Sequence, residues 1–180
     1  MTGFGDNKKS KKKIIKNIKP NNLKAQIINK AFTFHAKGDI AQAIKHYKYF
    51  INQGFADTQV FSNYGVLLKE LGNFTEAELF IRKAIELNPK FADTYVNLAG
   101  ILRDLGKLEE AELFSRKAIE LNPKFAMNHS NLGVILKDLG KLKEAEASFR
   151  KAISLNPKFA DAYLNLAALL RDFGKLKEAE

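Results

Sequence analysis

The residues of this chain best suited to chemistry are asparagines that recur at a fixed spacing. Four of them stand 34 residues apart, at Asn63, Asn97, Asn131 and Asn165. The asparagine amide offers two hydrogen-bond donors and one acceptor oxygen, which match the acceptor and the donor of a peptide backbone. A column of such amides on one face would hold an extended polypeptide regardless of its side chains. The spacing therefore indicates a binding surface rather than a reaction centre.

Charged residues follow each asparagine at the same period, a base six residues later and an acid seven residues later. The bases are Lys69, Arg103, Lys137 and Arg171, the acids include Asp104 and Asp138, and Asp93 precedes Asn97 by four residues. We take these residues, with the asparagines, as the candidate peptide-binding set. For the charges, the alternative is that they only solvate helix ends. For the asparagines, the alternative is a hydrogen bond that bridges neighbouring helices.

The sequence carries no recognisable catalytic or metal-binding motif. Its three histidines are His35, His46 and His129, and none belongs to a metal-binding, phosphate-binding or nucleophile motif. His129 takes a position that aromatic residues hold 34 residues away on either side, which indicates a packing role. The sequence has no cysteine, so disulfides and zinc–thiolate sites are excluded. We expect no catalytic site, no metal and no cofactor.

The elements that position these residues follow from the 34-residue period. Glycines recur at Gly38, Gly72, Gly106, Gly140 and Gly174. The segment RKAIELNPKFA at 82–92 returns unchanged at 116–126, which indicates one supersecondary unit copied in tandem. Within 92–125, Tyr95 and Leu98 begin a stripe at helical spacing. A second helix follows the glycine and ends at Asn-Pro, because proline cannot donate to the preceding turn. We predict an all-α fold.

The repeat resembles the tetratricopeptide repeat (TPR), a 34-residue helix-turn-helix motif. In 126–159 the matching residues are His129, Leu132, Gly133, Leu136, Ala145, Phe149 and Pro157. The sequence departs from the family pattern at Ser115, which replaces the usual aromatic residue, but the small residues, glycine and proline keep their spacing. The resemblance implies a right-handed α-solenoid whose first helices line the concave side.

The expected organisation follows from the repeat boundaries. Residues 1–23 form a basic disordered tail, and 24–57 form a divergent repeat or N-terminal cap that lacks the proline. Three full repeats follow at 58–91, 92–125 and 126–159, and 160–180 is an incomplete repeat. The last seven residues, GKLKEAE, match the turn and the start of a second helix. We therefore suspect a fragment of a longer protein, the alternative being a complete chain with a frayed last repeat.

Charge is concentrated in the tail. The net charge is +10, and residues 1–24 hold eight lysines against one acid, Asp6. The tail would make weak contact with nucleic acid or an anionic surface, the alternative being a solvated disordered segment. With no apolar run of about 18 residues and no secretory signal, we expect no membrane span and a cytoplasmic protein.

Two functions fit these patterns. The first is a non-catalytic interaction scaffold that binds an extended peptide or a partner protein in its concave groove. The second comes from the segment at 90–112, which resembles the repeat subtype of O-linked N-acetylglucosamine transferases. That likeness implies the substrate-recruiting part of a glycosyltransferase or other group transferase, with a catalytic domain beyond residue 180. The chaperone-binding subtype is disfavoured, since Val96 and Gly100 stand where its Lys and Asn are expected.

Overall fold

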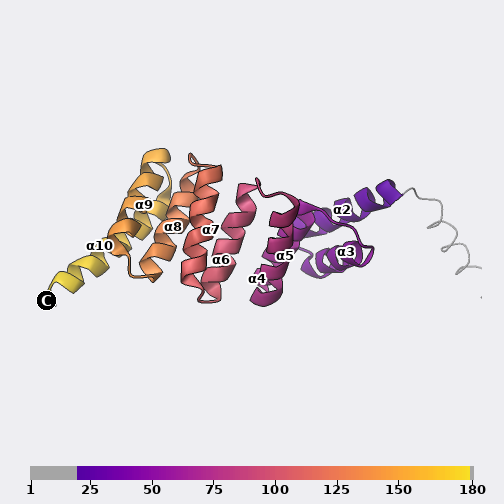
Figure 1. Cartoon of the computed structure of the whole chain (residues 1–180), viewed down its shortest axis with the longest axis horizontal. Helices are drawn as coiled ribbons and strands as arrows, with labels where there is room; N and C mark the ends of the chain where they lie inside the picture. The colour runs from indigo at the N-terminus through magenta and orange to yellow at the C-terminus, as the bar shows by residue number, and fades with distance from the viewer. Residues whose placement is uncertain (1–19, 179–180) are drawn as a thin grey trace, which may run out of the picture. The chain divides into compact units, whose positions relative to one another are not determined.

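The computed structural model describes residues 20–178, and in this part of the chain every regular element is a helix (Figure 1). The chain divides into two compact units, Met1–Ala56 and Asp57–Glu180. The helices of the first unit are α2 (Pro20–Ala36) and α3 (Ile40–Asn52). Those of the second are α4 (Thr58–Glu70), α5 (Phe74–Leu87), α6 (Ala92–Asp104), α7 (Leu108–Leu121), α8 (Ala126–Asp138), α9 (Leu142–Leu155) and α10 (Ala160–Glu178). The predicted all-α fold is confirmed.

In the second unit, each 34-residue repeat forms a pair of packed helices, namely α4 with α5, α6 with α7, and α8 with α9. The turn glycines Gly72, Gly106 and Gly140 take φ angles of 77°, 74° and 73°. A residue with a Cβ is strained in this left-handed conformation, which is why glycine recurs there. The next N–H then returns to a carbonyl of the first helix, as in the 2.8 Å bond from Lys107 N to Leu102 O.

The two helices of a repeat approach closely because a small residue on the first faces a larger one on the second. A Cβ added at Gly133 would lie 2.6 Å from the ring of Phe149, and one added at Gly65 would lie 2.7 Å from the Ile81 side chain. The repeat at 92–125 differs, since Ala99 and Ser115 hold the equivalent positions. The close helix contact is therefore made with a different pair of side chains in this repeat.

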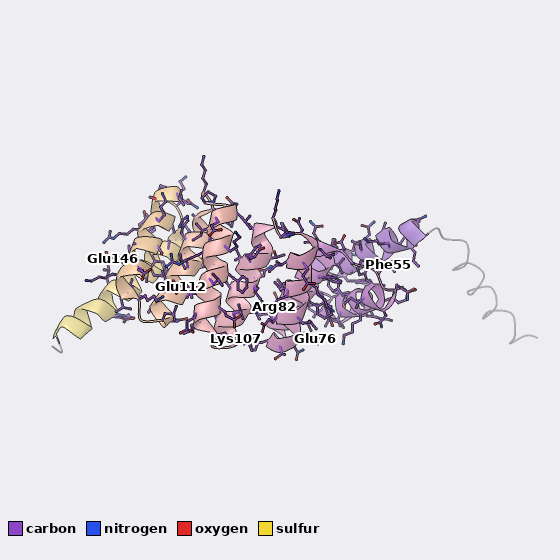
Figure 2. All side chains as sticks on the ribbon, in the orientation of Figure 1. Phe55, Glu76, Arg82, Lys107, Glu112 and Glu146 are labelled. Atoms are coloured by element: carbon purple, nitrogen blue, oxygen red, sulfur yellow. The ribbon has the colours of Figure 1, made fainter. Side chains whose placement is uncertain are left out.

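Ion pairs link the second helices of successive repeats. Arg82 of α5, labelled in Figure 2, bonds Glu78 one turn away at 2.8 Å and Glu110 of α7 at 3.0 Å. Lys107, at the start of α7, reaches back to Glu78 at 2.9 Å. The same network recurs 34 residues later among Glu112, Arg116, Lys141 and Glu144. Because the network spans two repeats, it stabilises the interface between them and not only one helix.

The carboxylate of Glu112 is held ionised by this network. The hydrogen bond from Lys141 lowers its pKa, and Arg116 adds to this effect, although desolvation by burial opposes it. For Glu78 the desolvation effect is the largest single contribution and would raise the pKa, but the hydrogen bonds from Lys107 and Arg82 together outweigh it, so the pKa is lowered. Both carboxylates therefore favour the folded state at neutral pH.

The first unit is a helix pair closed by aromatic residues. Nδ1 of His35 lies 2.9 Å from the hydroxyl of Tyr47, which is fully buried, and the rings of Phe50 and Phe55 lie 5.5 Å apart. Helix α2 begins at Pro20 and so includes the last residues of the segment that was expected to be a tail. Proline suits the first helical turn because its missing N–H would have no partner there. The predicted disorder of residues 1–19 lies outside the described residues.

The structure also differs from the expected end of a helix at Gly174. The sequence predicts a turn there, but α10 runs through this residue without interruption. Glycine alone does not end a helix, since the left-handed turn is favoured only when the following segment packs back on the first helix. Residues 175–178 continue the helix beyond Gly174 instead of starting a second one.

The contact between Gly133 and Phe149 yields the first prediction. Gly133→Ala should lower the free energy of unfolding by about 1–3 kcal/mol, because the new methyl group would overlap a fully buried ring. Phe149→Ser, which removes the ring instead, should cost more, about 3–5 kcal/mol, because it leaves a cavity in the core. Urea unfolding followed by circular dichroism measures both variants. Equal stability of Gly133→Ala and the unchanged protein would contradict the packing argument.

The network around Glu112 yields the second prediction. Because its pKa is lower in the folded state, its contribution is present above its unfolded pKa and is lost as pH falls through the folded value. Glu112→Gln should cost about 1–2 kcal/mol at pH 7, and this difference should shrink between about pH 5 and pH 3. Melting temperatures across that range test it, with the exposed Glu109→Gln on the same helix as control. A pH-independent difference would exclude the ion pairs as its cause.

Candidate functional site

A cleft of about 590 Å³ runs along the first helices of three repeats, α4, α6 and α8. These helices also contact one another directly across the repeat boundaries. The apolar part of the cleft includes Val66, Val96, Gly100 and Val134, which are small or of medium size. The polar part includes Lys69, Asn97, Arg103, Asp104 and Asn131. The cleft thus brings together five residues of the predicted binding set.

The two asparagines of the predicted set that line the cleft, Asn97 and Asn131, differ in their surroundings. Both are half-buried. Nδ2 of Asn97 donates to Oγ of Ser62 at 3.3 Å, so this amide bridges the first helices of two repeats. The residue that corresponds to Ser62 for Asn131 is Val96, which has no hydroxyl. The bridging interpretation therefore applies to Asn97, whereas Asn131 has no equivalent hydroxyl partner.

The charged residues along the first helices form a ladder of ion pairs between repeats. Nζ of Lys69 lies 3.2 Å from Oδ2 of Asp104, Arg103 pairs with Asp138, and Lys137 lies 3.0 Å from Asp172. In each case a base of one repeat meets the acid of the next. Gly100 assists the first pair, because a Cβ there would lie 3.1 Å from Nζ of Lys69. The charges therefore join repeats in addition to contacting solvent.

The other predicted site residues lie outside the residues that line the cleft. Asn63 and Asn165 are half-buried at the equivalent positions of α4 and α10, and Asp93 is exposed in the first turn of α6. Lys137 and Asp138 belong to the ion-pair ladder beyond the cleft, and Arg171 is exposed on α10, 3.7 Å from Asp172. The structure thus gathers part of the set into one surface.

Two buried polar residues of the cleft were not predicted from the sequence. Ser115 of α7 and Asn128 of α8 line the cleft, and each is only 2% exposed. Nδ2 of Asn128 donates to the carbonyl oxygens of Ala118 and Asn122, at 3.3 and 3.4 Å. The sequence does mark both residues as departures from the repeat pattern. The residues that correspond to Ser115 in neighbouring repeats are Ile81 and Phe149, and those that correspond to Asn128 are Val60, Thr94 and Ala162.

His129 forms a hydrogen bond with the loop between repeats. Its Nε2 lies 2.9 Å from the carbonyl oxygen of Pro123, to which the protonated nitrogen donates. The hydroxyl of Tyr95 donates to Pro89 O at 3.0 Å in the equivalent place. His129 therefore replaces a tyrosine hydrogen bond.

Comparison with known proteins places this architecture among helical-repeat interaction modules. Family models of the tetratricopeptide repeat match residues 58–91, 92–125, 128–159 and 148–180. The chain belongs to the tetratricopeptide repeat family, and the right-handed α-solenoid class follows. TPR domains are in general non-catalytic modules for protein interaction. No curated protein sequence matches the chain significantly.

Solved structures share the fold. MamA of Desulfovibrio magneticus RS-1 superimposes with a TM-score of 0.77 at 17% identity, covering 87% of this chain and 88% of that one. YrrB, described as a TPR protein with an unusual peptide-binding site, has a TM-score of 0.72 at 21% identity, with 78% and 72% covered. The first TPR of Spaghetti (RPAP3), bound to the HSP90 peptide SRMEEVD, has a TM-score of 0.62 at 23% identity, with 65% and 93% covered.

Between residues 20 and 178, no helix combines the length and the apolar character that crossing a bilayer requires.

The bond between Asn97 and Ser62 yields the third prediction. Asn97→Ala should lower the free energy of unfolding by about 1 kcal/mol, because it removes a hydrogen bond to the hydroxyl of Ser62, a residue that is 4% exposed. Asn131→Ala, which has no such bond to break, should stay within about 0.5 kcal/mol of the unchanged protein. Urea unfolding compares the two directly. Equal losses in both variants would mean that the bridge does not stabilise the array.

Proposed function

We propose that the repeat array of residues 57–180 is a non-catalytic interaction module that binds an extended peptide segment of a partner protein along the cleft. The observation that carries the proposal is the half-exposed amide of Asn131 beside an apolar floor of valine and glycine. An amide of this kind pairs with both backbone groups of a peptide residue. The apolar floor accepts the peptide's side chains while the backbone is held by the amide.

The ion-pair ladder supports the same role. Lys69 and Asp104 hold each other in place while each side chain remains about one third exposed. Charges that are already ordered cost less conformational entropy when a ligand binds. Since each base has an acid beside it, the cleft favours a ligand with mixed charges rather than one of a single sign. The peptide site of YrrB and the peptide complex of RPAP3 show that proteins of this fold can bind peptides.

The wider site is part of the proposal. Asn63, Asn97 and Asn165 extend the contact with the backbone, while Lys69, Arg103, Lys137, Arg171, Asp93, Asp104 and Asp138 choose among ligand side chains. In this proposal, residues 24–57 act as a divergent first repeat, and residues 160–180 begin a fourth full-pattern repeat. The protein works in the cytoplasm. The lysine-rich tail adds weak contact with nucleic acid or an anionic surface.

A second candidate rests on the repeat text at 90–112, which resembles that of O-linked N-acetylglucosamine transferases. In this proposal the same cleft presents substrate peptide to a catalytic domain encoded beyond residue 180. Sequencing the downstream DNA distinguishes the two candidates. A few hundred further residues with alternating helix and strand patterns would support the transferase, and a stop codon or a capping helix would support the simple module.

The fourth prediction tests the cleft. Asn131→Ala should weaken binding to an array of extended peptides about fivefold, because one net hydrogen bond contributes about 1 kcal/mol. The loss should be similar for peptides of different sequence, since the backbone is common to them. Asn73→Ala is the matched control, because Asn73 is exposed at the start of α5 and makes no capping bond through its side chain.

Two results would contradict the proposal. Binding by Asn131→Ala equal to that of the control would mean that this amide does not hold the peptide. Loss of helicity in circular dichroism would mean that Asn131 is needed for folding. Arg103→Ala adds a further check, since it should change which peptides are preferred rather than weaken all of them equally.

A further inference from the structure

The cleft has one feature that the other repeats do not share. At the position where α5 carries Ile81 and α9 carries Phe149, α7 carries Ser115. In the neighbouring repeats these large side chains fill the space up to a glycine on the first helix, within 2.7 Å of where a Cβ would be. Here the facing residue is Ala99, which adds back only one methyl group. The pair Ala99 and Ser115 therefore holds five fewer side-chain carbon atoms than Gly133 with Phe149 and two fewer than Gly65 with Ile81. Both residues of the pair line the cleft.

Asn128 adds an unusual polar group at the same place. Its side chain is 98% buried, given its 2% exposure, and it also lines the cleft. Its Nδ2 is engaged by two carbonyl oxygens at the end of α7, but Oδ1 has no hydrogen-bond partner among the described residues. A buried acceptor without a partner is costly, because it has given up its hydrogen bonds to water. The site therefore favours a ligand that supplies a donor.

We propose that Ala99, Ser115 and Asn128 form a side-chain pocket that takes a serine or threonine of the bound peptide. The pocket rests on the proposed function, since the peptide backbone lies in the cleft. A ligand hydroxyl donates its one proton to Oδ1 of Asn128 and accepts a hydrogen bond from the hydroxyl of Ser115. A valine of the same shape would leave the acceptor unpaired, and a charged side chain would lose its hydration in a buried site.

The pocket determines the register in which a peptide binds along the repeats. A column of amides that grips only backbone holds a peptide equally well after a shift by one repeat. The residues that correspond to Asn128 in the other three repeats are Val60, Thr94 and Ala162, and none of them carries an amide. A single pocket along the array therefore selects one position of the peptide and gives the module sequence preference.

The test fills the pocket with the side chains of the next repeat. Ala99→Gly/Ser115→Phe copies the pair Gly133 and Phe149, which already packs in this protein, so the fold has a precedent for it. The control makes the opposite exchange in the next repeat, Gly133→Ala/Phe149→Ser. In that repeat the residue that corresponds to Asn128 is Ala162, which has no amide. Asn128→Thr, which copies Thr94, removes the amide alone. Circular dichroism confirms that each variant keeps its helices.

The probe is a positional-scanning library of extended peptides. The unchanged protein should prefer threonine over valine about fivefold at one library position, as expected for one hydrogen bond. Ala99→Gly/Ser115→Phe and Asn128→Thr should lose that preference and keep binding through the rest of the peptide. The control exchange should retain it. If the filled variant keeps the threonine preference, the pocket is overturned while the proposed function stands. The same conclusion follows if the unchanged protein binds peptides without preferring threonine.

A second measurement does not depend on peptide binding. N-acetyl-threonine N-methylamide, compared with its valine counterpart at equal millimolar concentration, should shift the side-chain amide resonance of Asn128 in the unchanged protein and not in the filled variant. If the library does not bind at all, the proposed function fails, but a threonine-specific shift would still support the pocket. If neither compound shifts the resonance, the pocket holds only solvent and the inference is overturned.

Discussion

The close approach of the two helices in each repeat is the constraint on which the rest of the structure depends. At Gly133 the backbone of α8 comes so near the ring of Phe149 that no Cβ would fit, and Gly65 stands in the same relation to Ile81. This approach positions the first helix, and with it the asparagine that projects from the first helix. It also determines where space remains, because a repeat that changes the facing pair changes the depth of the cleft beside it.

Adjacent repeats are then joined by two sets of ion pairs on different helices. Between second helices, Glu78 and Glu112 are each bonded by two bases while their side chains are only 14% and 13% exposed. Between first helices, Lys69 and Asp104 form a more exposed pair in the cleft. Exposed pairs contribute little to stability one at a time, about 0–1 kcal/mol. The first set therefore mainly stabilises the array, and the second mainly orders charges at the surface where a ligand would bind.

Much of the fold could be predicted because the period makes the local signals agree. A glycine, an Asn-Pro and a stripe of apolar residues every 34 positions give the same answer for each repeat, and the helices α4 to α9 follow it. The helices differ from the expected bounds where the period is incomplete. Helix α2 starts at Pro20, earlier than expected, and α10 continues through Gly174. A turn is a tertiary feature there, since it requires a following helix that packs back.

The sequence by itself determined the repeat, the all-α class and the face on which the asparagines lie, because helical periodicity is a property of nearby residues. Only the tertiary structure decided which of these residues share a surface. Asn97 is hydrogen-bonded to Ser62, 35 positions away, whereas Val96 holds the position that corresponds to Ser62 in the repeat before Asn131, and no local pattern distinguishes the two asparagines. The combination of Ser115 with Asn128 was also beyond local reasoning. Each looks like a tolerated departure from the repeat, and only the packing of α7 against α8 brings a space and an unpaired acceptor to one cleft.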